Sequence, residues 1–284
     1  MFGEERRNMS VYQCPVCGSP LLQENKSYCC AKRHTYDIAR SGYVNLLHTK
    51  QQGKAVHGDN KLMVAARRDF LEQGFYAPLK DALCHAVSAY ATSGAVILDA
   101  GCGEGYYTAA VADSLCKSGK TVQLFGVDIS KTAVEFAAKR KKPISFCAAS
   151  VFHLPVLTQS CDILFSLFSP YCGSEFQRVL RTNGYMILAI PGAQHLWELK
   201  QAVYDTPYPN EVKPYALEGF RLERKEEIHC VLHLSRAEDI RNLFSMTPYY
   251  YKTGRTEQER LMALDSLETQ AEFELLIYQR DTLH

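Results

Sequence analysis

Apolar residues along the middle of the chain follow two alternating spacings. Short apolar runs of strand length are separated by stretches in which apolar residues recur every three or four positions, as on one face of a helix. Strands alternating with helices are typical of an α/β domain built on a mostly parallel sheet. The pattern predicts a Rossmann-like domain with seven strands, at 95–98, 124–128, 144–150, 161–170, 185–190, 227–235 and 271–279.

The chain before residue 95 reads differently. A helical pattern begins at Asn60 and ends at Gly74, and a second helix is expected over 79–91. The tail 1–10 is polar, and residues 48–59 are polar and glycine-containing, as in a linker. Residues 205–220 hold three prolines and read as a loop-rich insertion. We expect three parts: a small module at 1–47, a linker with two covering helices at 48–94, and the α/β domain at 95–284.

Composition narrows the class of protein. The 284 residues are 46% hydrophobic and 22% charged, and no apolar run reaches membrane-spanning length. Met1–Ser10 lacks the apolar core of a signal peptide, and eleven cysteines, an odd number, favour reduced thiols, so a cytoplasmic location is expected. Residues 1–93 carry 12 Lys and Arg against 8 Asp and Glu, which makes this third the better candidate for a nucleic-acid surface.

A glycine-rich bend follows the first predicted strand of the α/β domain. Asp99, Gly101, Gly103 and Gly105 form the spacing D-x-G-x-G-x-G, which differs from the G-x-G-x-x-G of dinucleotide sites. The motif resembles the first motif of the class I S-adenosylmethionine (SAM) methyltransferases, where it holds the methionine half of SAM. The alternatives are an ordinary glycine turn or a dinucleotide site of unusual spacing.

Asp128 ends the second strand, 23 residues after Gly105, close to the spacing of a ribose-binding acid. Ser130 can cap the next helix, which would leave Asp128 free for the ribose. Ala149 and Ser150 end the third strand, where the adenine rests in this fold. The ring of Tyr76 could lie over the sulfonium cation, or simply belong to the core. The remaining candidates for contact with SAM are Glu104, Tyr106 and His195.

Cysteines near the N-terminus have the spacing of a metal site. Cys14, Cys17, Cys30 and His34 give the pattern C-x2-C-x12-C-x3-H, which predicts a closed, structural Zn²⁺ site. Cys29 competes with Cys30 for the third position, and Cys30 is preferred for its distance from His34. The alternative is a set of unrelated cytosolic cysteines with a surface histidine.

Basic residues and tyrosines suggest contacts with RNA, whose bases stack on aromatic rings. Residues 35–47 read as a hairpin that completes the zinc module, and a tyrosine cluster at 249–251 could hold an extruded base. Packing of these tyrosines into small cores is the alternative. The candidates for RNA contact are Arg33, Arg40, Tyr43, Arg67, Arg68, Tyr249 and Tyr250.

Together these features resemble one family, the bacterial 23S rRNA (guanine-N1)-methyltransferases, which includes the macrolide-resistance type. The matching pieces are the four zinc ligands, 42–47, 58–59 with 66–68, Tyr76-x-Pro78-Leu79, the glycine motif, 191–200 and 246–248. The resemblance implies a zinc module that recognises a 23S rRNA hairpin, a class I SAM domain, often a homodimer, and SAM contacts from Tyr76, Glu104, Gly105 and His195. The segment 168–172 departs from the family pattern, so the residues facing the target base stay open.

The sequence does not identify a general base, and the candidates for a catalytic role are His195 and Ser169. Two other functions fit parts of the sequence. One is a SAM methyltransferase acting on a small molecule, and the other is a zinc-dependent RNA-binding protein with an inactive SAM fold.

Overall fold

A computed structural model describes residues 10–47, 60–140, 143–212, 214–251 and 253–281. Residues 1–9 of the expected tail and the expected linker at 48–59, with Gly58-Asp59, lie outside the described residues. None of the helices that the structure describes combines the length and the apolar character that a bilayer-spanning segment needs.

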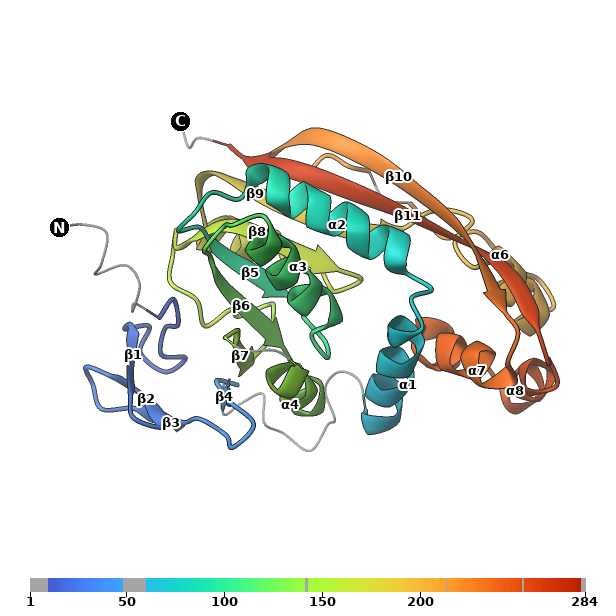
Figure 1. Ribbon diagram of the computed structural model, residues 1–284, viewed down its shortest axis with the longest axis horizontal. Helices are drawn as coiled ribbons and strands as arrows, with labels where there is room; N and C mark the ends of the chain where they lie inside the picture. The colour runs from blue at the N-terminus through green and yellow to red at the C-terminus, as the bar shows by residue number, and fades with distance from the viewer. Residues whose placement is uncertain (1–9, 48–59, 141–142, 213, 252, 282–284) are drawn as a thin grey trace.

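One twisted sheet organises the molecule (Figure 1). Its strand order is β10-β11-β9-β8-β5-β6-β7-β4. The neighbours from β9 to β4 are parallel, whereas β11 runs antiparallel to both β9 and β10. The strands span Tyr43–Asn45 (β4), Val96–Ala100 (β5), Gln123–Asp128 (β6), Ser145–Ala148 (β7), Cys161–Leu167 (β8), Leu180–Pro191 (β9), Phe220–Leu234 (β10) and Leu267–Arg280 (β11). The seven predicted strands and the Rossmann-like α/β class are confirmed, and β4 adds an eighth strand at the edge.

The two helices predicted before residue 95 begin within two residues of their expected starts. The helices of the structure span Lys61–Glu72 (α1), Ala77–Tyr90 (α2), Tyr106–Lys117 (α3), Lys131–Arg140 (α4), Gly173–Val179 (α5), Trp197–Val203 (α6), Ala237–Ser245 (α7) and Arg255–Met262 (α8), with a short 3-10 helix at Pro248–Tyr251 (η3). The Asn60 side chain accepts from the amide of Met63 at 3.0 Å and caps α1, which explains why the helix starts there. One apolar cluster joins α1, α2, α3, α6 and α7 to one face of the sheet.

The opposite face of the sheet is covered mainly by the N-terminal module and α5. Val11, Tyr12, Leu21 and Leu46 are buried in the same apolar cluster as Leu98, Leu164 and Phe176. The chain crosses from β7 to β8 without a helix, and the amide of Gln13 donates to Pro155 O there at 2.9 Å. The module therefore covers sheet surface that a crossover helix covers in a doubly wound fold.

The N-terminal module itself contains a three-stranded antiparallel sheet, formed by β1 (Leu21–Glu24), β2 (Ser27–Cys30) and β3 (Thr35–Asp37). The hairpin expected to complete the module at 35–47 is reduced to one bridge between Ile38 and Val44. Its second arm, β4, instead pairs in parallel with β7 of the large sheet. That part of the prediction is wrong, since Val44 and Leu46 are buried in the apolar cluster that joins the module to the large sheet.

The edge strand β10 is longer than predicted and begins at Phe220. Its first half is a run of charged residues, which hides the strand pattern in the sequence. These side chains pair with one another along the solvent side, as in the Arg224–Glu226 ion pair at 2.9 Å. A charged edge of this kind resists pairing with other chains.

Candidate functional site

The glycine bend between β5 and α3 is held against β6. The amides of Gly101 and Cys102 both donate to Val127 O, at 2.7 and 3.0 Å. Gly101, Gly103 and Gly105 all have positive φ, at 92°, 53° and 83°. A Cβ on Gly101 would overlap the side chain of Ser169, and one on Gly105 would lie 2.9 Å from Ala137 Cβ. The first and third glycines are thus needed for close packing as well as for the turn.

A cavity of about 750 Å³ opens beside this bend, a volume suited to a ligand of cofactor size. It brings together most of the residues predicted to contact SAM, and Ser169 as well. Gly105 and Ala149 stand outside its lining. The predicted residues in its wall are Tyr76, Asp99, Gly101, Gly103, Glu104, Tyr106, Asp128, Ser150, Ser169 and His195.

Asp128 ends β6 at the cavity wall, and its carboxylate is already engaged. Oδ2 accepts from the amide of Gly103 at 3.0 Å, and Oδ1 accepts from the amide of Ser130 at 2.8 Å. Ser130 caps α4 as predicted, because its Oγ accepts from the amide of Ala133 at 3.3 Å. The cap spares Asp128 from that role, although its carboxylate already accepts hydrogen bonds from two backbone amides. The carboxylate links the glycine bend to the start of α4, and it can still accept further bonds from a ligand.

Two other acids in the wall are buried. Glu104 forms an ion pair with Arg140, which also pairs with Glu72, and burial nevertheless raises the pKa of Glu104. Asp99 accepts a hydrogen bond from the Thr108 hydroxyl at 2.6 Å. Burial raises the pKa of Asp99 to about 8, since the charged form is poorly solvated there.

The raised pKa of Asp99 predicts a pH-dependent stability. Asp99 is ionised in the unfolded chain above about pH 4, whereas the folded protein keeps it protonated until about pH 8. The ligand-free protein should therefore lose stability as pH rises from about 4 to about 8, by at most about 1.4 kcal/mol for each step of one in pH. Asp99→Asn should flatten this dependence in thermal melts at pH 5 and pH 8. An equal slope in both proteins would contradict the assignment.

His195 lies in the cavity wall, packed against Phe273 with 4.8 Å between ring centroids. Its side chain is almost fully buried, and its Nδ1 has no hydrogen-bond partner within the described part of the chain. Burial lowers the pKa of His195 to about 3, so the ring is neutral at physiological pH. A buried, unpartnered ring nitrogen fits a hydrogen bond with a bound ligand.

One wall of the cavity was missed by sequence reasoning. Lys200, fully buried, donates to Asn210 Oδ1 at 2.6 Å and to Tyr208 O at 2.9 Å, and the Tyr249 hydroxyl donates to Asn210 Oδ1 at 3.2 Å. Tyr208, Asn210 and Glu211 all line the cavity. The segment predicted as a loop-rich insertion is thus fixed against α6 and η3. A signal in the sequence that could have shown this contact is Lys200, which occupies an apolar position among Leu196, Leu199 and Val203.

The predicted RNA contacts fall into separate groups. Arg67 and Tyr249 line the cavity, and Arg67 donates to Met246 O at 3.2 Å. Tyr250 packs on Phe244 instead. Arg68 lies 5.3 Å from the ring centre of Phe136 and pairs with Asp69. Arg33 and Arg40 are exposed on the module, and Tyr43 is half-buried in β4.

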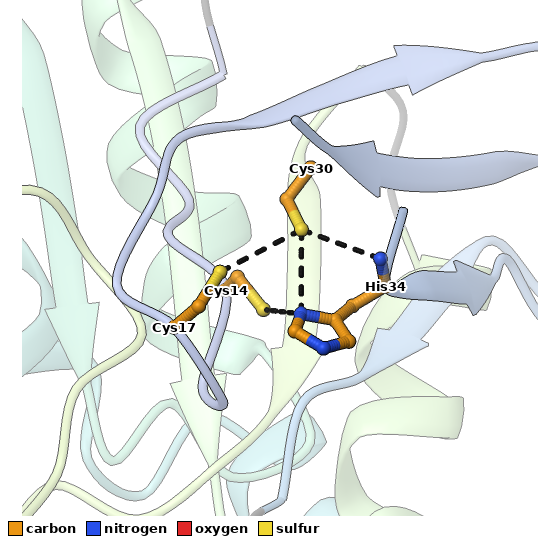
Figure 2. Close-up of side chains that lie close together, drawn as sticks. All are labelled: Cys14, Cys17, Cys30 and His34. Atoms are coloured by element: carbon orange, nitrogen blue, oxygen red, sulfur yellow. Dashed lines mark hydrogen bonds between the residues drawn. The ribbon is translucent and has the colours of Figure 1, made fainter. Parts of the chain in front are cut away.

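The predicted metal ligands meet in the N-terminal module (Figure 2). The ligand atoms of Cys14, Cys17, Cys30 and His34 lie within 4.8 Å of one another. Cys17 Sγ is 3.7 Å from Cys30 Sγ, and His34 Nδ1 is 3.4 Å from the Sγ atoms of Cys14 and Cys30. Tetrahedral zinc with Zn–S bonds of about 2.3 Å requires spacings of roughly this size. The cluster fits a Cys3His structural zinc site.

The choice between Cys29 and Cys30 is settled by strand alternation. Neighbouring residues of β2 point to opposite sides, so only one of the two faces the cluster. Cys30 is buried and does so, whereas Cys29 Sγ lies 3.5 Å from Thr35 Oγ1. Cys30 therefore supplies the third sulfur of the cluster, in agreement with the preference for it over Cys29.

Comparison with known proteins covers both parts of the chain. The model of the N-terminal zinc ribbon of RlmA matches residues 12–53, and a methyltransferase-domain model matches 91–245. A Streptomyces fradiae 23S rRNA (guanine(748)-N(1))-methyltransferase is 34% identical over 70% of each chain. The Bacillus subtilis (strain 168) protein YxjB, provisionally assigned as a 23S rRNA (guanine-N(1)-)-methyltransferase, is 32% identical over 95% of this chain and 97% of its own.

The predicted family resemblance is confirmed by these relatives, and the SAM and zinc cofactors by the methyltransferase fold and the Cys3His cluster. The Bacillus subtilis relative is matched over 95% of this chain, so its match extends over both the N-terminal module and the α/β domain. The chain therefore belongs to the family of RlmA-type 23S rRNA (guanine-N1)-methyltransferases.

Proposed function

We propose that this protein transfers the methyl group of SAM to N1 of a guanine in a hairpin of 23S rRNA. The observation that carries the proposal is the zinc ribbon packed on the sheet whose strand ends form the cavity. A methyltransferase of small molecules needs no such ribbon. Residues 1–47 would recognise the RNA, 48–94 would cover the SAM site, and 95–284 would carry out the transfer in the cytoplasm, as a monomer or a homodimer.

SAM supplies an activated methyl group, so the chain's own task is largely to bind and orient. Asp128 is placed to accept bonds from ribose hydroxyls, and the Gly103 amide it holds faces the same cavity. Ser150 follows β7 on the side proposed for the adenine. Tyr76 and His195 complete the wall on the methionine side, together with Glu104 and Tyr106.

The target guanine must leave its base pair, because N1 lies on the edge used in pairing. N1 also loses a proton during the transfer. A histidine whose pKa is held near 3 is a poor acceptor for that proton. We propose that the proton passes to water, and that His195 and Ser169 bind and position rather than act as the base.

His195→Ala tests this division of roles. We expect weaker SAM binding, because the Nδ1 contact and the packing on Phe273 are lost. At saturating SAM, kcat should stay within a few-fold of the wild-type value, and the pH profile between 5 and 8 should keep its shape, since the ring is neutral throughout. A loss of kcat by several orders of magnitude at saturating SAM would instead make His195 the base.

The proposed activity is tested with 23S rRNA that lacks the modification. The protein is incubated with this RNA and labelled SAM, and the product is mapped by primer extension. N1-methylguanine blocks pairing, so a single strong stop is expected, and Asp128→Ala should abolish it. SAM binding without label transfer to RNA would favour either a small-molecule methyltransferase or an inactive RNA-binding protein. The same mapping identifies the guanine.

A further inference from the structure

Phe168 has an unusual backbone. It directly follows β8 and adopts φ = 54°, the left-handed region that large L-residues avoid. Its amide donates to Ala189 O on β9 at 3.1 Å, which helps to hold it there. A glycine would adopt this conformation without strain. The protein keeps a phenylalanine in it, and strain of this kind is concentrated at functional sites.

The ring of Phe168 contributes little to the core. It is 46% exposed, although it lines the cavity. Its inner side meets Phe273, with 5.7 Å between centroids, and Phe273 in turn contacts Tyr76 and His195. Phe168 is therefore the solvent-facing end of an aromatic wall that begins deep in the proposed SAM site.

The position of Phe168 relative to the glycine bend decides which side of the cavity it serves. Its neighbour Ser169 lies so close to Gly101 that a Cβ there would overlap it. β8 is also the strand next to β5, which carries the bend, whereas β7, on the adenine side, is separated from β5 by β6. Phe168 thus lies on the side of the cavity next to the glycine bend, where the methionine half of SAM, and with it the methyl group, would lie in the proposed function.

From this geometry we infer that Phe168 is the stacking platform for the unpaired target guanine. The inference rests on the proposed function and adds a residue that binds the substrate base. A half-exposed ring beside the methyl donor presents an apolar face to a purine that has left its own stack. Stacking of a base on an aromatic side chain contributes about 1–3 kcal/mol.

Substitutions at Phe168 distinguish the effect of removing the aromatic ring from the effect of relieving the backbone strain. Phe168→Ala and Phe168→Gly both remove the ring, so both should lower kcat/KM for unmodified 23S rRNA by roughly 5- to 100-fold. The SAM Kd, measured by calorimetry, should stay within about twofold of wild type. Phe168→Trp should retain most of the activity. The glycine variant should melt roughly 2–4 °C above the alanine variant, because a positive φ strains alanine but not glycine.

Phe152 is the matched control, since it is 49% exposed and lines the same cavity. It lies after β7, close to Ser150 on the side proposed for the adenine. Phe152→Ala should therefore weaken SAM binding, whereas kcat/KM for RNA, measured at saturating SAM, should stay within a few-fold of the wild-type value. If the Phe168 variants methylate RNA like wild type, or if they lose SAM affinity in the same measure, the stacking role is overturned. A wild-type protein that methylates no 23S rRNA overturns the proposed function, and this inference with it.

Discussion

Replacing Gly101 by alanine is expected to abolish detectable SAM binding and to lower the free energy of unfolding by about 2–5 kcal/mol. Two effects add at this position. The backbone has φ = 92°, where alanine is strained, and the new Cβ would overlap the side chain of Ser169. Either Ser169 or the bend must move, and both line the cavity. Calorimetric titration with SAM and thermal melting measure the two losses separately.

Gly119→Ala is the control for strain alone. Gly119 has φ = 73°, yet nothing lies within 4 Å of the position that its Cβ would take. This variant should lose about 1–2 kcal/mol of stability and bind SAM normally. Adding Ser169→Gly to Gly101→Ala should recover part of the stability, because it removes the overlapping atoms. If Gly101→Ala binds SAM as well as Gly119→Ala does, the close approach at Gly101 is unimportant.

Loss of one zinc ligand should disturb both the N-terminal module and the SAM site. Cys14→Ala is expected to release the zinc, to abolish methylation of 23S rRNA and to lower the melting temperature by roughly 10 °C or more. Structural zinc contributes about 10–16 kcal/mol in small modules, and each kcal/mol corresponds to about 2–4 °C in a large domain. The module also covers one face of the sheet, so its unfolding would expose Leu98 and Leu164.

The same variant should weaken SAM binding, although Cys14 lies outside the cavity lining. The amide of Leu46 donates to Ala148 O at 2.9 Å, and β4 pairs with β7, which leads directly to Ser150. Cys29→Ala is the matched control, since Cys29 neighbours a ligand but faces away from the cluster. It should keep its zinc, measured by metal analysis, and its SAM affinity. Unchanged SAM affinity in a zinc-free Cys14→Ala protein would show that the two sites are independent.

Local chemistry made much of this protein predictable. Three features depend only on residues close together in the chain: the three glycines, the acid at the end of β6 and the Cys/His spacing. They can therefore be recognised without knowing the tertiary contacts of their segments. Strand positions in the α/β domain followed in the same way, because buried parallel strands are continuous apolar runs. Cys30 was preferred over Cys29 on spacing alone, and the alternation of β2 agrees.

Long-range contacts decided the rest. Val44 was predicted to belong to the zinc module, but its strand pairs with β7, and its side chain is buried in the apolar cluster that joins the module to the large sheet. Asp128 was predicted only as a ribose-binding acid, and the fold also gives it the Gly103 amide from 25 residues away. Lys200, Asn210 and Tyr249 meet only because α6, a proline-rich segment and η3 converge on one wall. The sequence by itself determined the fold class, the cofactors and the family, because these depend on residues close together in the chain. The tertiary structure decided which side chains face the cavity and how the zinc module supports it, because those depend on contacts between segments that no local pattern encodes.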